Sequence, residues 1–391
     1  MTLSRKQLRT ALINVALVFG ALLFTYVALE VALRLTAYPR QEIRFVCFDE
    51  VMGTVYCPGV RDTFLGPEGP YELRTNSDGL MTREYAVAKP AATYRIALLG
   101  DSIVASNYLD PHVRIDGMWE KELPERLNQE VEVINFAVQG TGTWEQLQMY
   151  HLKARKYRPD LVVLGFYWGN DVWNNTTKLD KGAPNPLHDD YNARFRRRVS
   201  AAHRGFSRWV WNHSLAYQFL RTLSDKTREA LRQIKTRGWR EVATDVTESV
   251  QRSASAAPPH LGTHLGTPEY DWDSRDWDLT RNLILKLKSE VEADGARLAV
   301  FHFPAIIHER SKLPAAAFQS FLEQHRIASF DLFGLYDAQD QARYLSQFIP
   351  GDVHWTQEGH ALAARYSLPA LSSIILESGS YPPTARGSRF P

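Results

Sequence analysis

The 391-residue chain alternates short apolar runs with segments of helical period, and this alternation limits most strongly what it can fold into. The apolar runs are continuous, which is typical of parallel strands buried on both faces of a sheet. They occupy residues 94–100, 131–137, 160–167, 296–303 and 326–332. The helical segments occupy residues 117–129, 143–157, 277–293, 313–324 and 356–377. The pattern predicts an α/β fold, a three-layer α/β/α sandwich with a mainly parallel five-stranded sheet.

Composition narrows the possible functions. With 44% hydrophobic residues the chain has enough apolar side chains for a sizeable core, which excludes disorder and coiled-coil structure. Lys and Arg number 46 and Asp and Glu 44, so the basic excess of a dedicated nucleic-acid binder is missing. Two cysteines cannot make a four-thiolate zinc site, and His302 and His308 have no evident third ligand. We expect no metal, no other cofactor and no nucleic-acid partner.

The N-terminal region contains twenty residues without a charge, from Thr10 to Leu29. As a helix this run roughly matches the ~30 Å hydrocarbon core of a bilayer. We expect residues 10–35 to form an uncleaved signal anchor, with residues 1–9 in the cytoplasm. A cleaved signal peptide is the alternative, but its apolar core is usually shorter.

Two cysteines follow this apolar run, Cys47 and Cys57. Beyond an N-in anchor they lie in an exported compartment, where disulfides form. A disulfide between them requires the loop to bring their Cα atoms within reach, and a reduced pair is the alternative.

The rest of the chain divides by its patterning. Residues 36–93 form a juxtamembrane segment of turns and short strands, residues 94–377 form the α/β domain, and residues 378–391 form a tail. Residues 178–275 interrupt the alternation and are too long for a βα loop, which predicts an insertion with helical stretches of its own.

The insertion concentrates basic charge. Between Arg194 and Arg240 there are thirteen Lys and Arg residues but only two acidic residues, with aromatic side chains interleaved. This composition suits anionic lipid headgroups or an acidic polysaccharide. A solvated helical face whose aromatic side chains pack on the core is the alternative.

Polar residues follow the strands where a parallel sheet binds its ligands, at the carboxyl edge. The first run ends in Gly100-Asp101-Ser102, the second in a loop that reaches Gly140, and the third in Gly169-Asn170-Asp171. Near the C-terminus, Asp352 and His354 precede the final helical segment. Together these residues include a nucleophile, a base and a residue to orient the base.

In this order the blocks resemble the SGNH (GDSL-type) hydrolase superfamily. The four blocks read GDS (100–102), NFAVQG (135–140), GND (169–171) and DVH (352–354). Two further stretches, RTNSDGL (74–80) and FYWGNDVWNN (166–175), resemble membrane-anchored bacterial members. The resemblance implies a flavodoxin-like sheet.

The resemblance also implies a role for each residue. Ser102 is the implied nucleophile, His354 the general base and Asp352 the residue that holds the imidazole. The implied oxyanion hole consists of the Ser102 and Gly140 N–H groups and the Asn170 side-chain amide. Two departures are present: Asp352 lies two residues before His354 where many relatives have three, and Gly142 is an alternative to Gly140.

From these residues we expect a serine esterase that cleaves an O-acyl ester through a covalent acyl-enzyme. One alternative is an O-acyltransferase that modifies an envelope polysaccharide, because both reactions form the same intermediate. A second is a non-catalytic scaffold with polysaccharide-export partners. The expected substrate is an acylated small molecule, glycan or lipid, and the expected location is the bacterial inner membrane, single-pass, with the catalytic domain in the periplasm or outside. Asp101 and Asp171 are expected to organise loops, and His360 to be structural.

Overall fold

The computed structural model describes residues 5–36, 45–49, 51–66, 69–180, 187, 214–217, 219–220, 223, 227, 270–304, 313–337, 341–349 and 352–378. The chain divides into two compact units. One combines residues 1–46 with 202–257, and the other combines residues 47–201 with 258–391. Each unit is described separately below.

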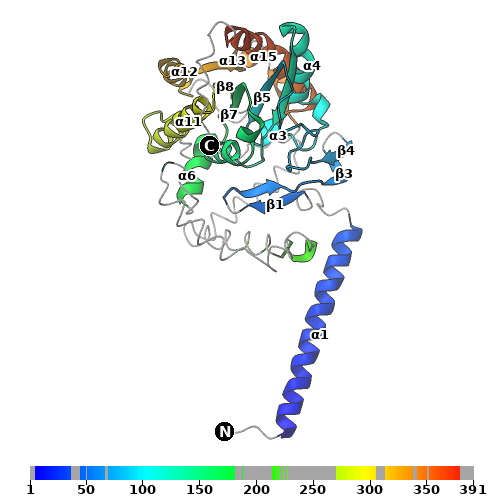
Figure 1. Ribbon diagram of the computed structural model, residues 1–391. Coiled ribbons are helices and arrows are strands. Elements are labelled where there is room, and N and C mark those ends of the chain that lie inside the picture. Colours follow the sequence, from blue (N-terminus) through cyan, green and yellow to red (C-terminus); the bar gives the residue numbers. More distant parts are fainter. Residues whose placement is uncertain are drawn as a thin grey trace, which may run out of the picture. The chain divides into compact units, whose positions relative to one another are not determined.

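The first unit contains one long helix, α1 (Arg5–Leu35), drawn in Figure 1 as an uninterrupted blue ribbon. Its window Ala16–Leu35 has a mean hydropathy of 2.1 and is only 6% buried, so it is long and apolar enough to cross a membrane. One carboxylate lies in this window. Glu30 pairs with Arg34 and accepts hydrogen bonds from Ser214 Oγ at 2.9 Å and from the Ala216 N–H at 2.7 Å.

The second unit is built on a five-stranded sheet in the order β6-β5-β7-β8-β9, and every neighbouring pair is parallel. This order is the flavodoxin-like arrangement of a doubly wound sheet. The strands are β5 (Thr93–Leu99), β6 (Glu130–Asn135), β7 (Leu161–Tyr167), β8 (Arg297–Phe303) and β9 (Ala328–Asp331). All five predicted strands are present, and the predicted fold class is confirmed.

Helices cover both faces of this sheet (Figure 1). On one face α4 packs against α15 and β6, and on the other α11 packs against α5, α6 and β8. The helices of this unit are α3 (Ser102–Ala105), α4 (Ile115–Leu127), α5 (Thr143–Leu152), α6 (Asp171–Asp180), α11 (Arg275–Ala293), α12 (Ala315–Gln324), α13 (Phe333–Asp337), α14 (Gln341–Ser346) and α15 (Gln357–Ser378), with 3-10 turns η1 (Pro111–Val113) and η2 (Ala154–Tyr157).

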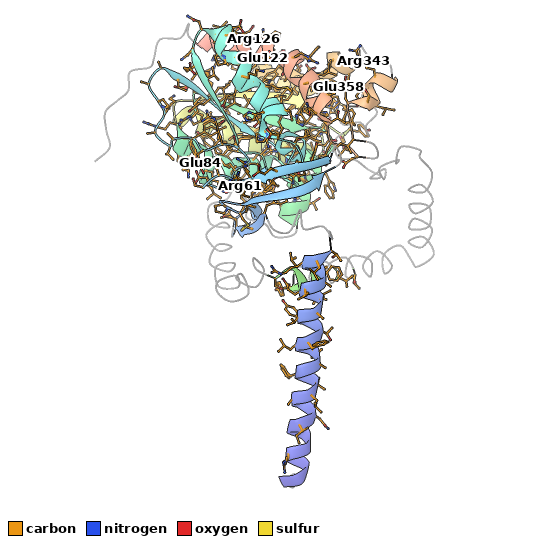
Figure 2. All side chains as sticks on the ribbon, turned by 90° about the vertical axis from the view of Figure 1, so that its right-hand side faces the viewer. Arg61, Glu84, Glu122, Arg126, Arg343 and Glu358 are labelled. Carbon is orange, nitrogen blue, oxygen red and sulfur yellow. A yellow bond between two sulfur atoms is a disulfide. The ribbon has the colours of Figure 1, made fainter. Side chains whose placement is uncertain are left out.

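Helix α4 illustrates how the layers form. Trp119 and Leu123 are fully buried in the core between α4, α15 and the sheet. Glu122 and Arg126 border this buried stripe and form a partly exposed pair 4.0 Å apart (Figure 2). Lys121 and Glu125 lie on the opposite side of the helix and are exposed. An apolar stripe of this kind packs a helix onto a sheet, while the charged residues outside the stripe stay in contact with solvent.

Two short hairpins precede the sheet in the chain. One consists of β1 (Val46–Asp49) and β2 (Gly53–Tyr56), and the other of β3 (Arg61–Gly66) and β4 (Gly69–Arg74). Cys47 and Cys57 form a disulfide across the first hairpin, with an S–S distance of 2.03 Å and Cα atoms 4.9 Å apart. The sequence left this pairing open, and the structure resolves it as bonded.

Most of the predicted insertion, residues 178–275, lies outside the described residues. This includes nearly all of the basic and aromatic stretch between Arg194 and Arg240. Within it the structure describes residues 215–217 as helical, and Leu215 and Ala216 pack with Leu33 of α1 in the first unit.

Candidate active site

The Gly100-Asp101-Ser102 turn joins β5 to the short helix α3. Asp101 caps this helix, because its Oδ1 accepts the Ile103 N–H at 2.9 Å. Ser102 is the first helical residue and is half-buried. A Cβ at Gly100 would lie 2.6 Å from Val104 Cγ2, so glycine is required here by the close packing of α3 on the strand end.

The loop after β6 is hydrogen-bonded to this turn. The Val138 N–H donates to Gly100 O at 3.1 Å, and Thr141 Oγ1 donates to the same oxygen at 3.1 Å. Between them Gly140 adopts a φ of +68°, which favours glycine. The N–H of Gly142 donates to Glu145 Oε2 at 2.9 Å as part of the start of α5. The alternative donor Gly142 is therefore already engaged.

The third block, Gly169-Asn170-Asp171, joins β7 to α6. Asn170 O accepts the Asn174 N–H at 2.7 Å, which starts the helix. Asn170 Oδ1 is buried and has no hydrogen-bond partner among the described residues. Asp171 Oδ2 accepts the Tyr167 N–H at 3.0 Å, so Asp171 ties the turn back to its own strand.

The fourth block places a carboxylate against an imidazole. His354 Nδ1 donates to Asp352 Oδ1 at 2.5 Å, and the same oxygen accepts the N–H groups of Val353 at 2.6 Å and His354 at 3.3 Å. Burial alone would raise the pKa of Asp352, but the hydrogen bond and charge of His354 outweigh it and hold the pKa below its usual value. A carboxylate on Nδ1 keeps the proton there, which leaves Nε2 as the basic nitrogen.

The loop that carries His354 is fixed at its base. Phe348 and Trp355 form an antiparallel bridge, and Trp355 is buried against Phe303 with ring centroids 4.9 Å apart. Tyr108, which follows α3, donates its hydroxyl hydrogen to Trp355 O at 2.8 Å and places its ring edge-on to His354 at 5.9 Å. The segment after α3 thus contacts the fourth block directly.

Electrostatics connect the blocks further. Burial raises the pKa of the Asp101 carboxyl to about 6, although the Ile103 N–H, the charge of His354 and the Asn170 amide stabilise its charged form. Burial and the charge of Asp101 raise the pKa of Asp171 well above its usual value. Both carboxyl groups serve as backbone acceptors, as expected of loop-organising residues.

No three His, Cys, Asp or Glu side chains gather in the way a metal would need within the described ranges. His302 is buried instead, and its Nδ1 accepts the Trp168 Nε1 hydrogen at 3.3 Å. His308 lies outside the described residues.

Three residues near these blocks did not figure in the sequence-based site. Tyr56 accepts the Gln139 N–H at 3.0 Å, Ser106 bonds His360, and Tyr108 contacts the His354 loop. Their partners are distant in the chain, so no local sequence motif predicts these contacts. His360 itself was expected to be structural and is fully buried.

Asp101 interacts with the Asn170 amide and with the charge of His354, and the Gly100 carbonyl binds the loop of the second block. These contacts lie at the carboxyl edge of a parallel sheet, where α/β enzymes bind their ligands. The sequence pattern of the family described as GDSL-like Lipase/Acylhydrolase matches residues 96–367. The chain therefore belongs to the GDSL-like lipase/acylhydrolase family, and the resemblance to SGNH hydrolases and the expectation of an ester-hydrolysing enzyme are confirmed.

Solved structures similar to this chain include TesA, at 13% identity, which covers 72% of this chain and 99% of its own length with a TM-score of 0.35. The lipase/acylhydrolase from Enterococcus faecalis is 13% identical and covers 72% and 96% with a TM-score of 0.37. The lipase Lip_vut3 from a goat rumen metagenome is 12% identical and covers 71% and 97% with a TM-score of 0.37. No curated protein matches the chain.

Proposed function

We propose that the protein is a membrane-anchored serine esterase that hydrolyses an O-acyl ester. The observation that carries the proposal is the 2.5 Å contact of His354 Nδ1 with Asp352 Oδ1, in a chain of this family whose GDS turn starts α3 at the same edge of the sheet. Asp352 and His354 thereby have the arrangement that turns an imidazole into a general base.

In the proposed reaction Ser102 Oγ attacks the ester carbonyl while its proton passes to His354 Nε2. The leaving alcohol takes that proton as the C–O bond breaks, and the acyl group stays on Ser102. Water then attacks the acyl-enzyme and gives a proton to His354. The bond between Ser102 Oγ and the acyl carbon breaks, Ser102 takes the proton back from His354, and the acid leaves. Asp352 stays ionised and balances the imidazolium.

The negative charge on the acyl oxygen is stabilised by N–H donors. We assign this role to the backbone N–H groups of Ser102 and Gly140 and to the Asn170 side-chain amide. The engagement of the Gly142 N–H by Glu145 supports Gly140 over Gly142. Loss of one such donor commonly costs ~10²–10³ in kcat.

The test uses the full chain in detergent with p-nitrophenyl acetate and longer esters, beside Ser102→Ala. Hydrolysis that disappears in Ser102→Ala supports the proposal, and equal activity of both proteins contradicts it. A fluorophosphonate probe separates the scaffold alternative, because only an activated serine reacts with it. Mass spectrometry of products formed with an added sugar acceptor separates hydrolysis from acyl transfer.

We further propose that α1 holds the enzyme in the bacterial inner membrane with its second unit in the periplasm. The apolar window of α1 supports an anchor, and the Cys47–Cys57 disulfide supports an oxidising compartment. A tether of this kind concentrates the enzyme on acylated envelope glycans or lipids, which are the proposed substrates.

The proposed orientation has a direct test. Alkaline phosphatase folds only after export, so a C-terminal fusion to it is expected to be active. An active β-galactosidase fusion at the same position would contradict the orientation. The mass of the mature N-terminus then distinguishes an uncleaved anchor from a cleaved signal peptide.

A further inference from the structure

The juxtamembrane hairpin reaches the loop of the second block through one side chain. Tyr56 ends β2, is 2% exposed, and its hydroxyl oxygen accepts the Gln139 N–H at 3.0 Å. Gln139 immediately precedes Gly140, whose φ is +68°. The hydroxyl of Tyr56 therefore fixes the peptide next to the one that presents the Gly140 N–H.

Other bonds hold the same loop from the side of the sheet. Asn107 Nδ2 donates to Gln139 Oε1 at 2.8 Å, and Val138 N–H donates to Gly100 O at 3.1 Å. Together with Tyr56 these contacts fix consecutive residues of the loop. Loss of the Tyr56 hydroxyl leaves the partly buried Gln139 N–H without this acceptor, which favours a shift of the loop to regain one.

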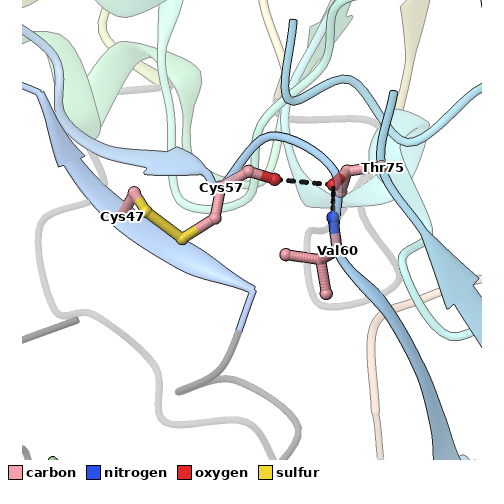
Figure 3. Close-up of a disulfide and its surroundings, with 4 residues drawn as sticks. All are labelled: Cys47, Cys57, Val60 and Thr75. Carbon is pink, nitrogen blue, oxygen red and sulfur yellow. Dashed lines mark hydrogen bonds between the residues drawn. A yellow bond between two sulfur atoms is a disulfide. The ribbon is translucent and has the colours of Figure 1, made fainter. Parts of the chain in front are cut away.

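Several contacts hold the backbone on the C-terminal side of Tyr56. Cys57 follows it and is bonded to Cys47 of β1, which closes the hairpin. Cys57 O accepts the Thr75 hydroxyl hydrogen at 2.6 Å, and Thr75 Oγ1 accepts the Val60 N–H at 2.8 Å (Figure 3). The disulfide and Thr75 therefore act on the residue adjacent to Tyr56.

The RTNSDGL stretch (74–80), which the reaction itself does not use, supplies the other side of this support. Gly79 has a φ of +72°, and a Cβ there would lie 2.3 Å from Tyr56 O. Asn76 Oδ1 accepts the N–H groups of Asp78 at 3.0 Å and Leu80 at 2.8 Å, which shapes the turn around Gly79. The stretch therefore packs closely against the backbone of Tyr56 and Cys57.

We propose that Tyr56 is a positioning residue for ester hydrolysis, and that the Cys47–Cys57 disulfide acts through it to hold the Gly140 N–H in the oxyanion hole. This inference rests on the proposed function. It makes turnover depend on the oxidised hairpin, so the enzyme reaches full activity only where the disulfide forms.

The first experiment compares Tyr56→Phe with Tyr85→Phe in the full chain. Tyr85 is the control, because it is also a buried tyrosine whose hydroxyl bonds a backbone group, Val133 O at 3.0 Å, within strand β6 and six residues before Gln139. Its hydroxyl also bonds Glu120 Oε2 at 2.6 Å. We expect Tyr56→Phe to lower kcat by roughly 10- to 100-fold with little change in KM, since a small displacement of a catalytic group costs this much. Tyr85→Phe is expected to keep the parent kcat.

Hydrogen exchange at the Gln139 amide provides a readout that does not need activity. Faster exchange is expected in Tyr56→Phe than in the parent or in Tyr85→Phe. Unchanged exchange overturns the inference, because it means that the hydroxyl does not hold the loop.

The disulfide is tested on the folded protein with dithiothreitol and with the Cys47→Ser/Cys57→Ser variant. Both are expected to lower kcat in the parent and to have no further effect in Tyr56→Phe, since coupled changes are not additive. An additive loss, or a parent kcat unaffected by reduction, overturns the inference.

The outcomes also separate this inference from the proposed function. If hydrolysis depends on Ser102 but Tyr56→Phe has the parent kcat, only the inference fails. If hydrolysis does not depend on Ser102, the proposed function fails and takes the catalytic role of Tyr56 with it. Should Tyr56→Phe fail to fold, reduction of the folded parent alone decides: a retained kcat overturns the inference and a loss supports it.

Discussion

His360 Nε2 lies 2.6 Å from Ser106 Oγ and joins helix α15 to the residue that ends α3. His360 Nδ1 accepts the Ile115 N–H at 3.3 Å, so the ring proton is on Nε2 and is donated to Ser106. The Ser106 hydroxyl in turn donates a hydrogen bond to Ile103 O at 2.7 Å. Burial, with the charge of Arg114, lowers the pKa of His360 to about 3, so this link is neutral at ordinary pH. It ties the helix of Ser102 to the helix that follows His354.

Replacement of Ser106 tests this link. Ser106→Ala leaves the His360 N–H buried without a partner, which is expected to cost about 1–3 kcal/mol of unfolding free energy. Ser106 has a φ of +35°, a backbone conformation that glycine adopts without steric strain. Ser106→Gly is therefore expected to destabilise less than Ser106→Ala while it lowers kcat as well. Urea unfolding and kcat check both, and a Ser106→Gly variant with the parent kcat would show that the hydroxyl does not position α3.

Removal of the Asp352 charge is expected to affect kcat more than the fold. Asp352→Asn takes away the carboxylate that holds the His354 proton on Nδ1, and comparable changes elsewhere lower kcat by as much as ~10⁴. Because the Asp352 side chain is 44% exposed, we expect the lower part of a range of about 10²–10⁴. Steady-state kinetics with Asp352→Glu as control measures this, and a retained kcat would remove Asp352 from the mechanism.

The same residue has a stability signature in acid. A carboxyl whose folded pKa is held below its unfolded value of 3.8 adds stability above that value and loses it as the pH falls through the folded pKa. Asp352→Asn is therefore expected to destabilise the protein more at pH 7 than at pH 2. Unfolding free energies measured at both values give the answer, and an equal difference at both would assign the low pKa to another cause.

Asp101 should produce the opposite pH dependence. Its folded pKa of about 6 lies above the unfolded value of 3.8, so its contribution to stability is present below pH 3.8 and is lost as the pH rises to about 6. Asp101→Asn keeps an acceptor for the Ile103 N–H and removes the buried charge. We expect this variant to gain stability relative to the parent between pH 4 and pH 7. Unfolding free energies across that interval test it, and parallel curves for the two proteins would contradict it.

The sequence predicted the sheet well because the physical signal is local and strong. Strands buried on both faces read as continuous apolar runs, and each predicted run overlaps one strand, with ends that differ by at most two residues. The differences lie at element ends. The helix expected from residue 313 begins at Ala315 after Pro314, and the strand expected from residue 326 begins at Ala328, because Arg326 adopts a φ of +53°.

The supports of the site were out of reach of the sequence. Tyr56 and Gln139 are 83 residues apart, and Ser106 and His360 are 254 apart. These contacts depend on how the hairpins and helices pack, and no periodicity encodes that. The order of the four blocks was readable, because strand ends of a parallel sheet meet at one edge whatever the details of packing.

The glycine of the GDS turn gives a last prediction. A Cβ at Gly100 would lie 2.6 Å from Val104 Cγ2, and that β-branched side chain also sits 2.8 Å from a Cβ built on Gly165. Gly100→Ala is therefore expected to displace α3, at about 1–3 kcal/mol of unfolding free energy. Displacement of Ser102 should also lower kcat, by up to ~10².

Val104 Cβ also lies 2.7 Å from that position, so only removal of the whole side chain removes the obstacle. Gly100→Ala/Val104→Gly should therefore lose less stability than the two single changes together. Additive losses in the double variant would mean that Gly100 is needed for a reason other than the approach of Val104.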